Sequence, residues 1–193
     1  QQIWKEVVVM IADKSALLVI DVQNQFVEGL PEEMKGLSVV ESVKHVIEAF
    51  RKAGRPIIYF REVHRKNLVD FGRELDGDED VHAVEETRAA DYFTGIEPLP
   101  EEYQIVKRRY SGFFGTDLEI LLKGLGIEHI YGVGLLTDVC VHYTCADAHQ
   151  HDYHIHVVRE AVGGSSLVAH EAALAAIEYL QHGAVISEKE VCE

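Results

Sequence analysis

Residues 16–21, which read ALLVID, decide the fold. The run is short and apolar, contains β-branched side chains and ends on a carboxylate, so it predicts a β-strand. An amphipathic helix is expected next over residues 39–52 (VVESVKHVIEAFRK), ending at Gly54, because glycine commonly terminates helices. A strand followed by a helix is the repeating unit of a parallel sheet.

The same alternation continues along the chain. Further strands are expected at 56–60, 104–107, 129–134, 155–159 and 184–187, and further helices at 116–123, 138–151 and 166–181. Right-handed crossovers then place helices on both faces of the sheet. The predicted fold is α/β, a three-layer doubly wound sandwich with a mainly parallel six-stranded sheet.

The length of 193 residues fits one domain over residues 1–193, without internal repeats. Only residues 62–100, rich in charge, lack a clear pattern. A long excursion of this kind in a compact domain is often a functional loop or lid.

Charge and hydropathy limit the partners. A net charge of −15 argues against nucleic acid, which is bound by clustered Lys and Arg. The apolar runs are too short to span a bilayer, so no membrane partner is expected. The N-terminus shows no basic region followed by a cleavable apolar stretch, which predicts a cytoplasmic protein.

Three reactive groups are expected at one edge of the sheet. Asp21 ends the first strand, Lys107 ends the third, and Cys140 follows the fourth strand at the start of a helix. Ligands of such sheets bind where the strands end. A helix N-terminus and a nearby cation stabilise a thiolate, and a carboxylate can accept and return a proton. The three residues together therefore predict nucleophilic catalysis.

Each of these residues taken alone is more typical of a structural role. A cysteine in an apolar chain is usually a small core residue, and an aspartate after a strand often caps a turn. Lys107, Arg108 and Arg109 form a run that usually faces solvent. Their joint position on three strand ends favours the catalytic interpretation.

At these residues the chain resembles the isochorismatase-like cysteine hydrolases, which include nicotinamidase and N-carbamoylsarcosine amidase. The matching segments are 16–26 (ALLVIDVQNQF), 107–118 (KRRYSGFFGTDL) and 132–141 (GVGLLTDVCV). They occur in the order of the family, and the similarity extends from about residue 14 to 187.

The resemblance implies a triad of Asp21, Lys107 and Cys140 that acts through a thioester-type intermediate. It also implies a cis peptide at the bond Leu136–Thr137, and amides of Thr137 and Cys140 directed at the oxyanion. By similarity of position, the pocket walls are implied to be Phe26, Tyr110 and Phe113.

The metal site of nicotinamidases, an Asp-x-His pair with a further His, corresponds here to Glu62, His64 and His82. Glu and His both ligate divalent metals such as zinc, manganese or iron. The change from Asp to Glu nevertheless favours a polar loop face without ligands. The resemblance thus implies a hydrolase that requires no cofactor, with these three residues as the candidate metal site.

The resemblance leaves several reactions open. Isochorismatase itself cleaves a vinyl ether and can lack the cysteine, so Cys140 favours a small amide, ureido or carbamoyl substrate. A nicotinamidase and an ether hydrolase remain alternatives. Members commonly form dimers or tetramers, so a homo-oligomer is expected.

Two alternatives belong to other classes. Gly132-x-Gly134 after a strand is a weak sign of a dinucleotide-binding oxidoreductase, because the third glycine of that fingerprint is missing. A non-catalytic member that binds a metabolite or a partner is also compatible with the sequence. Finally, His149, His151, His154 and His156 are expected to scatter over a helix end, a turn and a strand, with no site.

Overall fold

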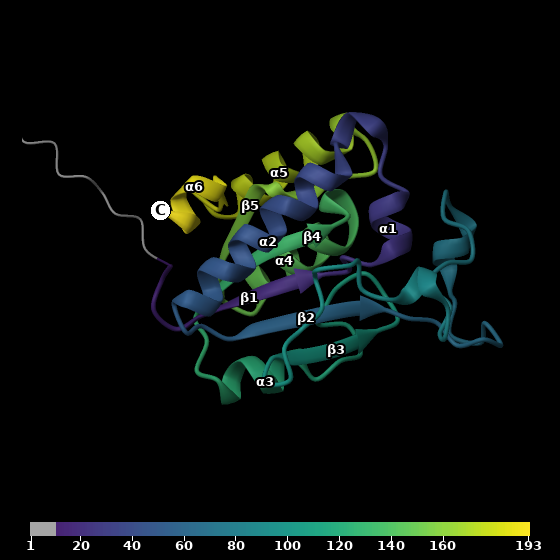
Figure 1. Ribbon diagram of the computed structural model, residues 1–193, viewed down its shortest axis with the longest axis horizontal. Coiled ribbons are helices and arrows are strands. Elements are labelled where there is room, and N and C mark those ends of the chain that lie inside the picture. The colour runs from purple at the N-terminus through teal and green to yellow at the C-terminus, as the bar shows by residue number, and fades with distance from the viewer. Residues whose placement is uncertain (1–10) are drawn as a thin grey trace, which may run out of the picture.

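The fold is built on a parallel sheet, so the carboxyl ends of its strands lie on the same side. The structure, a computed structural model, describes residues 11–193. Its strands are β1 (Ser15–Ile20), β2 (Ile57–Glu62), β3 (Tyr103–Lys107), β4 (His129–Leu135), β5 (His154–Gly163) and β6 (Val185–Ile186). Its α-helices are α1 (Asn24–Glu28), α2 (Gly36–Lys52), α3 (Leu118–Gly124), α4 (His142–Gln150), α5 (Leu167–Leu180) and α6 (Glu188–Cys192) (Figure 1). Shorter turns are η1 (Glu32–Met34), η2 (Arg73–Asp76), η3 (Arg88–Ala90) and η4 (Thr137–Val141).

The strand order is β3-β2-β1-β4-β5-β6, and each neighbouring pair is parallel. The chain starts in the centre at β1, runs outward to β3, and returns to the other side of β1 with β4. Leu17 of β1 pairs with Ile57 of β2 and with Tyr131 of β4. This is the doubly wound arrangement expected from the sequence, and the predicted fold class is confirmed.

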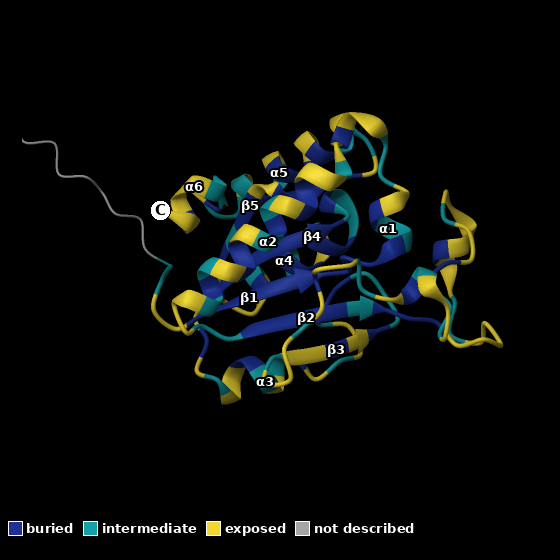
Figure 2. Ribbon diagram, in the orientation of Figure 1, coloured by how far each residue is buried: buried dark blue, intermediate teal, exposed yellow. Residues whose placement is uncertain are grey.

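Helices cover both faces of the sheet (Figure 1). Because side chains alternate along a strand, Leu17 and Val19 of β1 pack with α2, whereas Leu18 and Ile20 pack on the opposite side with α3, α4 and α5. Every residue of β1 is buried, while the edge strand β3 is mostly exposed (Figure 2). A strand buried on both faces explains why residues 16–20 are uniformly apolar.

Gly134 lets β4 approach β1 closely. Its φ is +117°, and a β-carbon there would lie 2.0 Å from the carbonyl oxygen of Ile20. Only glycine fits this position. The structure therefore gives Gly134 a packing role, in place of the dinucleotide role considered for Gly132-x-Gly134.

The expected elements differ from the observed ones mainly at their ends. The helix expected over 138–151 is divided into the π-helical turn η4 and the α-helix α4. The sequence analysis missed α1 and α6, since each has only five residues and shows no helical period. Strand β5 runs four residues beyond its expected end, to Gly163.

The excursion expected over residues 62–100 is tied to α1 by consecutive amide side chains. The side chain of Gln23 donates to the carbonyls of Glu62 and Ala90, each at 2.9 Å. Asn24 donates to the carbonyl of Arg88 at 2.8 Å, and Gln25 accepts from the N–H of Ala83 at 2.8 Å. Buried backbone groups of the excursion thereby obtain partners that the sheet does not provide.

The four clustered histidines are divided among the end of α4, the turn after it and β5, as expected, but the two on β5 join a stack of rings. His154 and His156 of β5 stack with His129 and Tyr131 of β4, at ring-centroid distances of 4.3 to 5.4 Å. We call these four residues the histidine stack. The other two histidines lie elsewhere: His149 bonds to Gln181, and His151 stacks on Phe113.

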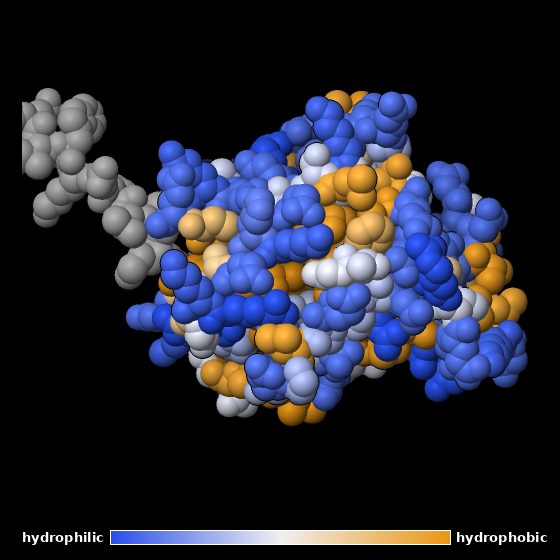
Figure 3. Space-filling view, viewed as in Figure 1, coloured by the Kyte–Doolittle hydropathy of each residue, from blue (hydrophilic) through white to orange (hydrophobic). Residues whose placement is uncertain are grey.

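The surface is mainly hydrophilic on the face shown in Figure 3. Figure 3 shows mostly polar side chains on this face, with apolar ones in smaller patches. Over residues 11–193, no helix combines the length and the apolar character needed to cross a bilayer. The segment on which the signal-peptide expectation depends, residues 1–10, lies outside the described residues.

Candidate active site

The three residues predicted to react lie together at the carboxyl ends of the strands: two follow the central strands β1 and β4, and the third ends the edge strand β3. Asp21 directly follows β1, Lys107 is the last residue of β3, and Cys140 lies in η4 after β4. After β1 the strands are added on one side, as β2 and β3, and from β4 onward on the other side. The order therefore reverses between β1 and β4, and ligands bind at this point in doubly wound sheets.

Lys107 connects the other two members. Its Nζ lies 2.6 Å from Asp21 Oδ2 and donates to Cys140 Sγ at 3.4 Å. It also donates to the carbonyl of Arg109 at 2.9 Å, so three groups surround the ammonium. Asp21 and Lys107 are each 1% exposed and Cys140 is 6% exposed. Their mutual attraction is therefore poorly screened by water.

Burial decides the resting charges. It raises the pKa of Asp21 to about 6, against the opposing charge of Lys107. Burial also raises the pKa of the Cys140 thiol well above its usual value, and Lys107 only partly offsets this. Burial alone would lower the pKa of Lys107, but the charges of Asp21, Cys140 and Glu62 outweigh it and raise the pKa. At neutral pH the site holds a carboxylate, an ammonium and a neutral thiol, and not the resting thiolate that the sequence suggested.

Backbone geometry fixes Asp21. Its φ of +50° lies in the left-handed region, which aspartate tolerates better than most residues. Its N–H donates to the carbonyl of Phe60 at 3.1 Å, and its carbonyl accepts from the N–H of Gln23 at 2.8 Å. The Asp21 carboxylate is thereby held at the end of β1, where Lys107 reaches it.

The cis peptide lies one bond earlier than expected. It joins Leu135 and Leu136, and not Leu136 and Thr137. The carbonyl of Leu136 accepts from the N–H groups of Val139 and Val141, both at 3.1 Å. The Leu136–Thr137 peptide is therefore already the first unit of the helical turn and has the trans form of helical peptides.

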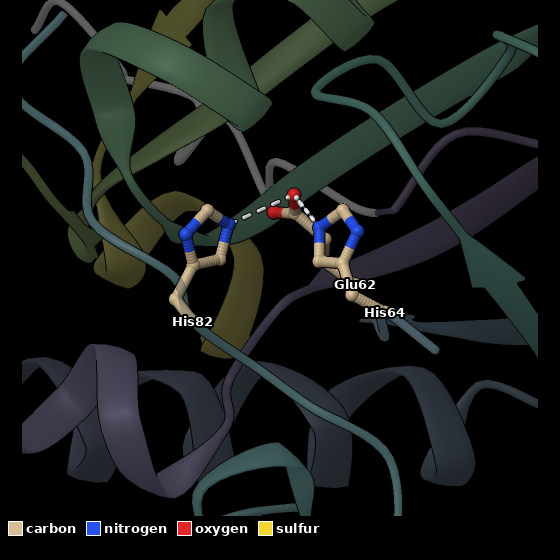
Figure 4. Close-up of side chains that lie close together, drawn as sticks. All are labelled: Glu62, His64 and His82. Atoms are coloured by element: carbon tan, nitrogen blue, oxygen red, sulfur yellow. Dashed lines mark hydrogen bonds and ion pairs between the residues drawn. The ribbon is translucent and has the colours of Figure 1, made fainter. Parts of the chain in front are cut away.

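A second cluster contains the three candidate metal ligands. Glu62 Oε1 lies 3.0 Å from His64 Nε2 and 3.2 Å from His82 Nε2, and the three side chains point toward one another (Figure 4). One ligand atom of each residue lies within 4.8 Å of the others, and all three residues are buried. The expectation of a polar loop face is wrong here, because the excursion folds His82 back over the end of β2.

The outer nitrogens of both rings are fixed. His82 Nδ1–H donates to the carbonyl of Asp80 at 2.6 Å, and His64 Nδ1 lies 3.2 Å from Asp70 Oδ1. With its hydrogen on Nδ1, a neutral His82 would turn a lone pair toward the Glu62 carboxylate. A cation must therefore lie between them, either a proton or a metal ion. Burial lowers the pKa of His82, but the hydrogen bond and charge of Glu62, together with the Asp80 carbonyl and the Glu79 charge, outweigh it and raise the pKa to about 9, so a proton occupies this position in the metal-free protein.

Glu74 joins this cluster, and sequence reasoning missed it. Its Oε1 lies 3.8 Å from His64 Nε2 and is buried without a hydrogen-bond partner among residues 11–193. Residue 74 lies in the part of the chain without periodicity, so no pattern indicated that it is buried. The cluster thus has four side chains that could hold a divalent cation.

Glu62 belongs to both clusters. Besides contacting the two histidines, its carboxylate lies within 4.8 Å of ligand atoms of Asp21 and Cys140. It also pairs with Lys107 across β2 and β3. The candidate metal site and the triad are therefore one continuous buried polar network.

The expected pocket walls divide into two groups. Phe26 packs edge-to-face against His82 at 5.9 Å, and the Tyr110 hydroxyl donates to Glu79 at 3.3 Å. Phe113 stacks on His151, just beyond the C-terminal end of α4, and its place in a pocket wall stays a prediction.

The residues of the triad are almost entirely buried, and two hollows lie in other parts of the surface. A groove of about 280 Å³ lies beside the lysine segment and is lined by Arg109, Tyr110, Ser111, Phe114, Tyr143 and Asp147. A larger cavity of about 650 Å³ is lined by residues such as Arg51 and Tyr103, at the opposite edge of the sheet.

Comparison with known proteins identifies relatives over most of the chain. A family model described as the isochorismatase domain matches residues 15–191. The chain is 34% identical over 166 residues to a probable inactive nicotinamidase of Arabidopsis thaliana, covering 82% of this chain and 85% of that protein. It is 30% identical over 170 residues to the ureidoacrylate amidohydrolase RutB of Caulobacter segnis, covering 76% and 71%. The pyrazinamidase of Pyrococcus horikoshii, solved in complex with zinc, matches with a TM-score of 0.77 at 32% identity, over 90% of this chain and 99% of that one.

The fold and the family model define the class of protein. The chain belongs to the isochorismatase family, whose members are hydrolases. Its relatives include amidohydrolases and a nicotinamidase labelled inactive.

Proposed function

We propose that this protein is a cysteine-dependent amidohydrolase that cleaves a C–N bond in a small amide, ureido or carbamoyl compound. The observation that carries the proposal is the position of Lys107 Nζ, 2.6 Å from a carboxylate and 3.4 Å from a thiol in one buried site. Burying two charged groups beside a thiol costs folding free energy, and such clusters of buried titratable groups are typical of functional sites. In this proposal Cys140 is the nucleophile, Asp21 the general base and acid, and Lys107 the cation.

The resting charges define the first step. The Cys140 thiol is neutral, whereas Asp21, with its pKa raised to about 6 by burial, is ionised at pH 7. As sulfur attacks the substrate carbonyl, the S–C bond forms and the thiol proton moves to Asp21. Lys107 keeps its charge and stabilises the negative charge that passes between sulfur and carboxylate.

The later steps return the proton. The C–N bond breaks as Asp21 delivers its proton to the leaving nitrogen, which leaves a thioester on Cys140. Water then attacks the thioester carbonyl and gives a proton to Asp21, and the S–C bond breaks. The proton returns to the sulfur, and the acid product leaves.

The developing oxyanion needs donors that are already in place. In this proposal the N–H groups of Thr137 and Cys140, at the start of η4, supply them. The first N–H groups of a helical turn point out of its end and carry partial positive charge.

The second cluster fits a divalent metal. Two imidazole nitrogens and a carboxylate oxygen converge, their outer ring nitrogens are fixed, and Glu74 Oε1 is buried without a partner among the described residues. Glu62, His64 and His82 would hold an ion such as zinc, with Glu74 next to them. When bound, the ion would orient a donor atom of the substrate.

Two substrate classes follow from two observations. The ureidoacrylate amidohydrolase relative supports a ureido or carbamoyl substrate. The metal cluster, together with the similarity to a zinc-bound pyrazinamidase, supports an aromatic amide such as nicotinamide. We place the ureido or carbamoyl class first, because Glu62 stands where nicotinamidases have Asp.

An ammonia-release screen tests the proposal. The panel contains ureido acids, carbamoyl amines, maleamate, biuret and nicotinamide, each assayed with metal-free and zinc-loaded protein. We expect release from at least one compound, loss of release in Cys140→Ala, and retention in Cys145→Ala, the matched control on α4. Cleavage of a vinyl ether without any ammonia release would indicate an ether hydrolase, and tight binding without turnover would indicate a non-catalytic member.

A further inference from the structure

The turn that carries Cys140 is an unusual one. In η4 the N–H of Val141 donates to the carbonyl of Leu136, five residues earlier, at 3.1 Å. This π-type bonding is rare, because the α-helical pattern of four-residue steps is favoured. A π turn therefore needs support from residues outside it.

Helix α5 supplies a buried contact to this turn. Thr137 Oγ1, in the first residue of η4, forms a hydrogen bond with His170 Nδ1 of α5 at 2.8 Å. Thr137 is fully buried and His170 is 5% exposed. Water cannot replace this bond if either partner is removed, so its loss leaves an unsatisfied buried polar group.

The connection between β5 and α5 also contacts η4. The N–H and hydroxyl of Ser165 donate to the carboxylate of Asp138, at 2.8 and 2.6 Å. Gly164 is packed between the two contacts, since a β-carbon there would lie 2.8 Å from His170 Cβ and 2.9 Å from Asp138 Oδ1. The start of α5 and the start of η4 are thus fitted closely to each other.

We infer that His170 is a positioning residue for the nucleophile: through the Thr137 hydroxyl it holds η4 in the register that keeps Cys140 Sγ beside Lys107 Nζ. The inference rests on the proposed role of Cys140 in the function above. His170 touches neither the thiol nor a substrate in this account. It acts by preventing the turn from changing its hydrogen-bond pattern.

The consequence of losing the bond follows from helix geometry. If η4 relaxed toward α-helical bonding, each residue would rotate about the helix axis, because an α-turn holds fewer residues than a π-turn. Cys140 would then turn away from Lys107 and Asp21. A displacement of about 1 Å at a reacting atom can cost about 100-fold in rate.

Alkylation of Cys140 by iodoacetamide, followed by peptide mass mapping, tests the inference without a known substrate. We expect Thr137→Val and His170→Leu each to slow Cys140 alkylation by about 100-fold. The double variant should be no slower than either single one, because all three remove the same bond. Thr137→Ser and His170→Asn, which retain a hydroxyl and a nitrogen or oxygen at the bonding position, should restore most of the rate.

A stability control separates positioning from general loosening. Leu174→Val changes a buried side chain one turn further along α5 and leaves the Thr137–His170 bond intact. It should lower the melting temperature without slowing alkylation. If His170→Leu does not fold, Thr137→Val removes the same bond from the other side.

The outcomes are distinct. Wild-type alkylation of Cys140 no faster than that of Cys145 would overturn the proposed nucleophile and this inference with it. Fast wild-type alkylation that Thr137→Val and His170→Leu leave unchanged, or slow no more than Leu174→Val does, would overturn the role of His170 alone. Failure of Thr137→Ser to restore the rate would also contradict it.

Discussion

At the scale of single residues, the protonation of the site differs from what a sequence can suggest. A cysteine at the start of a helix and near a lysine is usually expected to be a thiolate. Here burial raises the pKa of the Cys140 thiol. Lys107 lowers this pKa only partly, because the negative charge of Asp21, which pairs with Lys107, raises it. In the proposed mechanism the carboxylate of Asp21 therefore takes the proton during attack.

If Asp21 is the base, as proposed, its protonation state sets the lower pH limit of activity. Burial raises its pKa to about 6, so it is ionised at pH 7 and becomes protonated as the pH falls through 6. Because only the carboxylate accepts the thiol proton, we expect kcat/KM to fall about tenfold per pH unit below pH 6. Measuring ammonia release from pH 4.5 to 8 checks this. Activity that stays constant down to pH 4.5 would exclude Asp21 as the base, whereas Asp21→Asn should be inactive throughout the range.

At the scale of elements, the sequence predicted the site residues that lie at the end of a strand or soon after it. Asp21, Lys107 and Cys140 could be placed at one edge because parallel strands end at the same side of a sheet, whatever their loops do. The π turn could not be predicted, since its register depends on contacts from α5 that are distant in sequence. Glu74 was missed for a related reason, and the grouping of His64 with His82 was implied by the family resemblance and not by any pattern in the sequence. The positions of these side chains depend on the hydrogen bonds by which Gln23 and its neighbours hold residues 62–100 against α1.

The excursion brings the candidate ligands Glu62, His64 and His82 together in the protein without a metal ion, which predicts a preformed site. The metal-free chain should bind one equivalent of zinc, measured by titration calorimetry. Glu62→Gln should weaken binding by at least about tenfold, because it removes the one charged oxygen that both histidines face. His142→Gln, a histidine outside the cluster, should bind zinc like the wild type. Equal affinities of Glu62→Gln and wild type would argue against the site.

At the scale of the whole molecule, stability should depend on pH through the histidine stack. Burial, and then the charges of His129 and His154, lower the pKa of His156 from 6.5 to about 4. Between those values the unfolded chain takes up a proton that the folded chain does not, so the folded state loses stability as the pH falls. Above pH 6.5 this residue contributes no pH dependence.

Urea unfolding at pH 7 and pH 4.5 checks this expectation. His156→Phe keeps an aromatic ring against Tyr131 and removes the titrating group. It should reduce the loss of unfolding free energy on acidification by on the order of 2 kcal/mol, after allowance for the partial exposure of the ring. His182→Gln, on an exposed loop, should behave as the wild type. The same loss in His156→Phe and wild type would contradict the role of the stack.

The central claim is that Cys140 forms a covalent intermediate during C–N hydrolysis, and trapping that intermediate tests it most directly. With a compound that releases ammonia, acid quenching followed by intact-mass and peptide analysis should show the acyl part of the substrate on the peptide containing Cys140. Cys140→Ala should show neither adduct nor turnover. Turnover that continues in Cys140→Ala, or an adduct on another residue, would contradict the account.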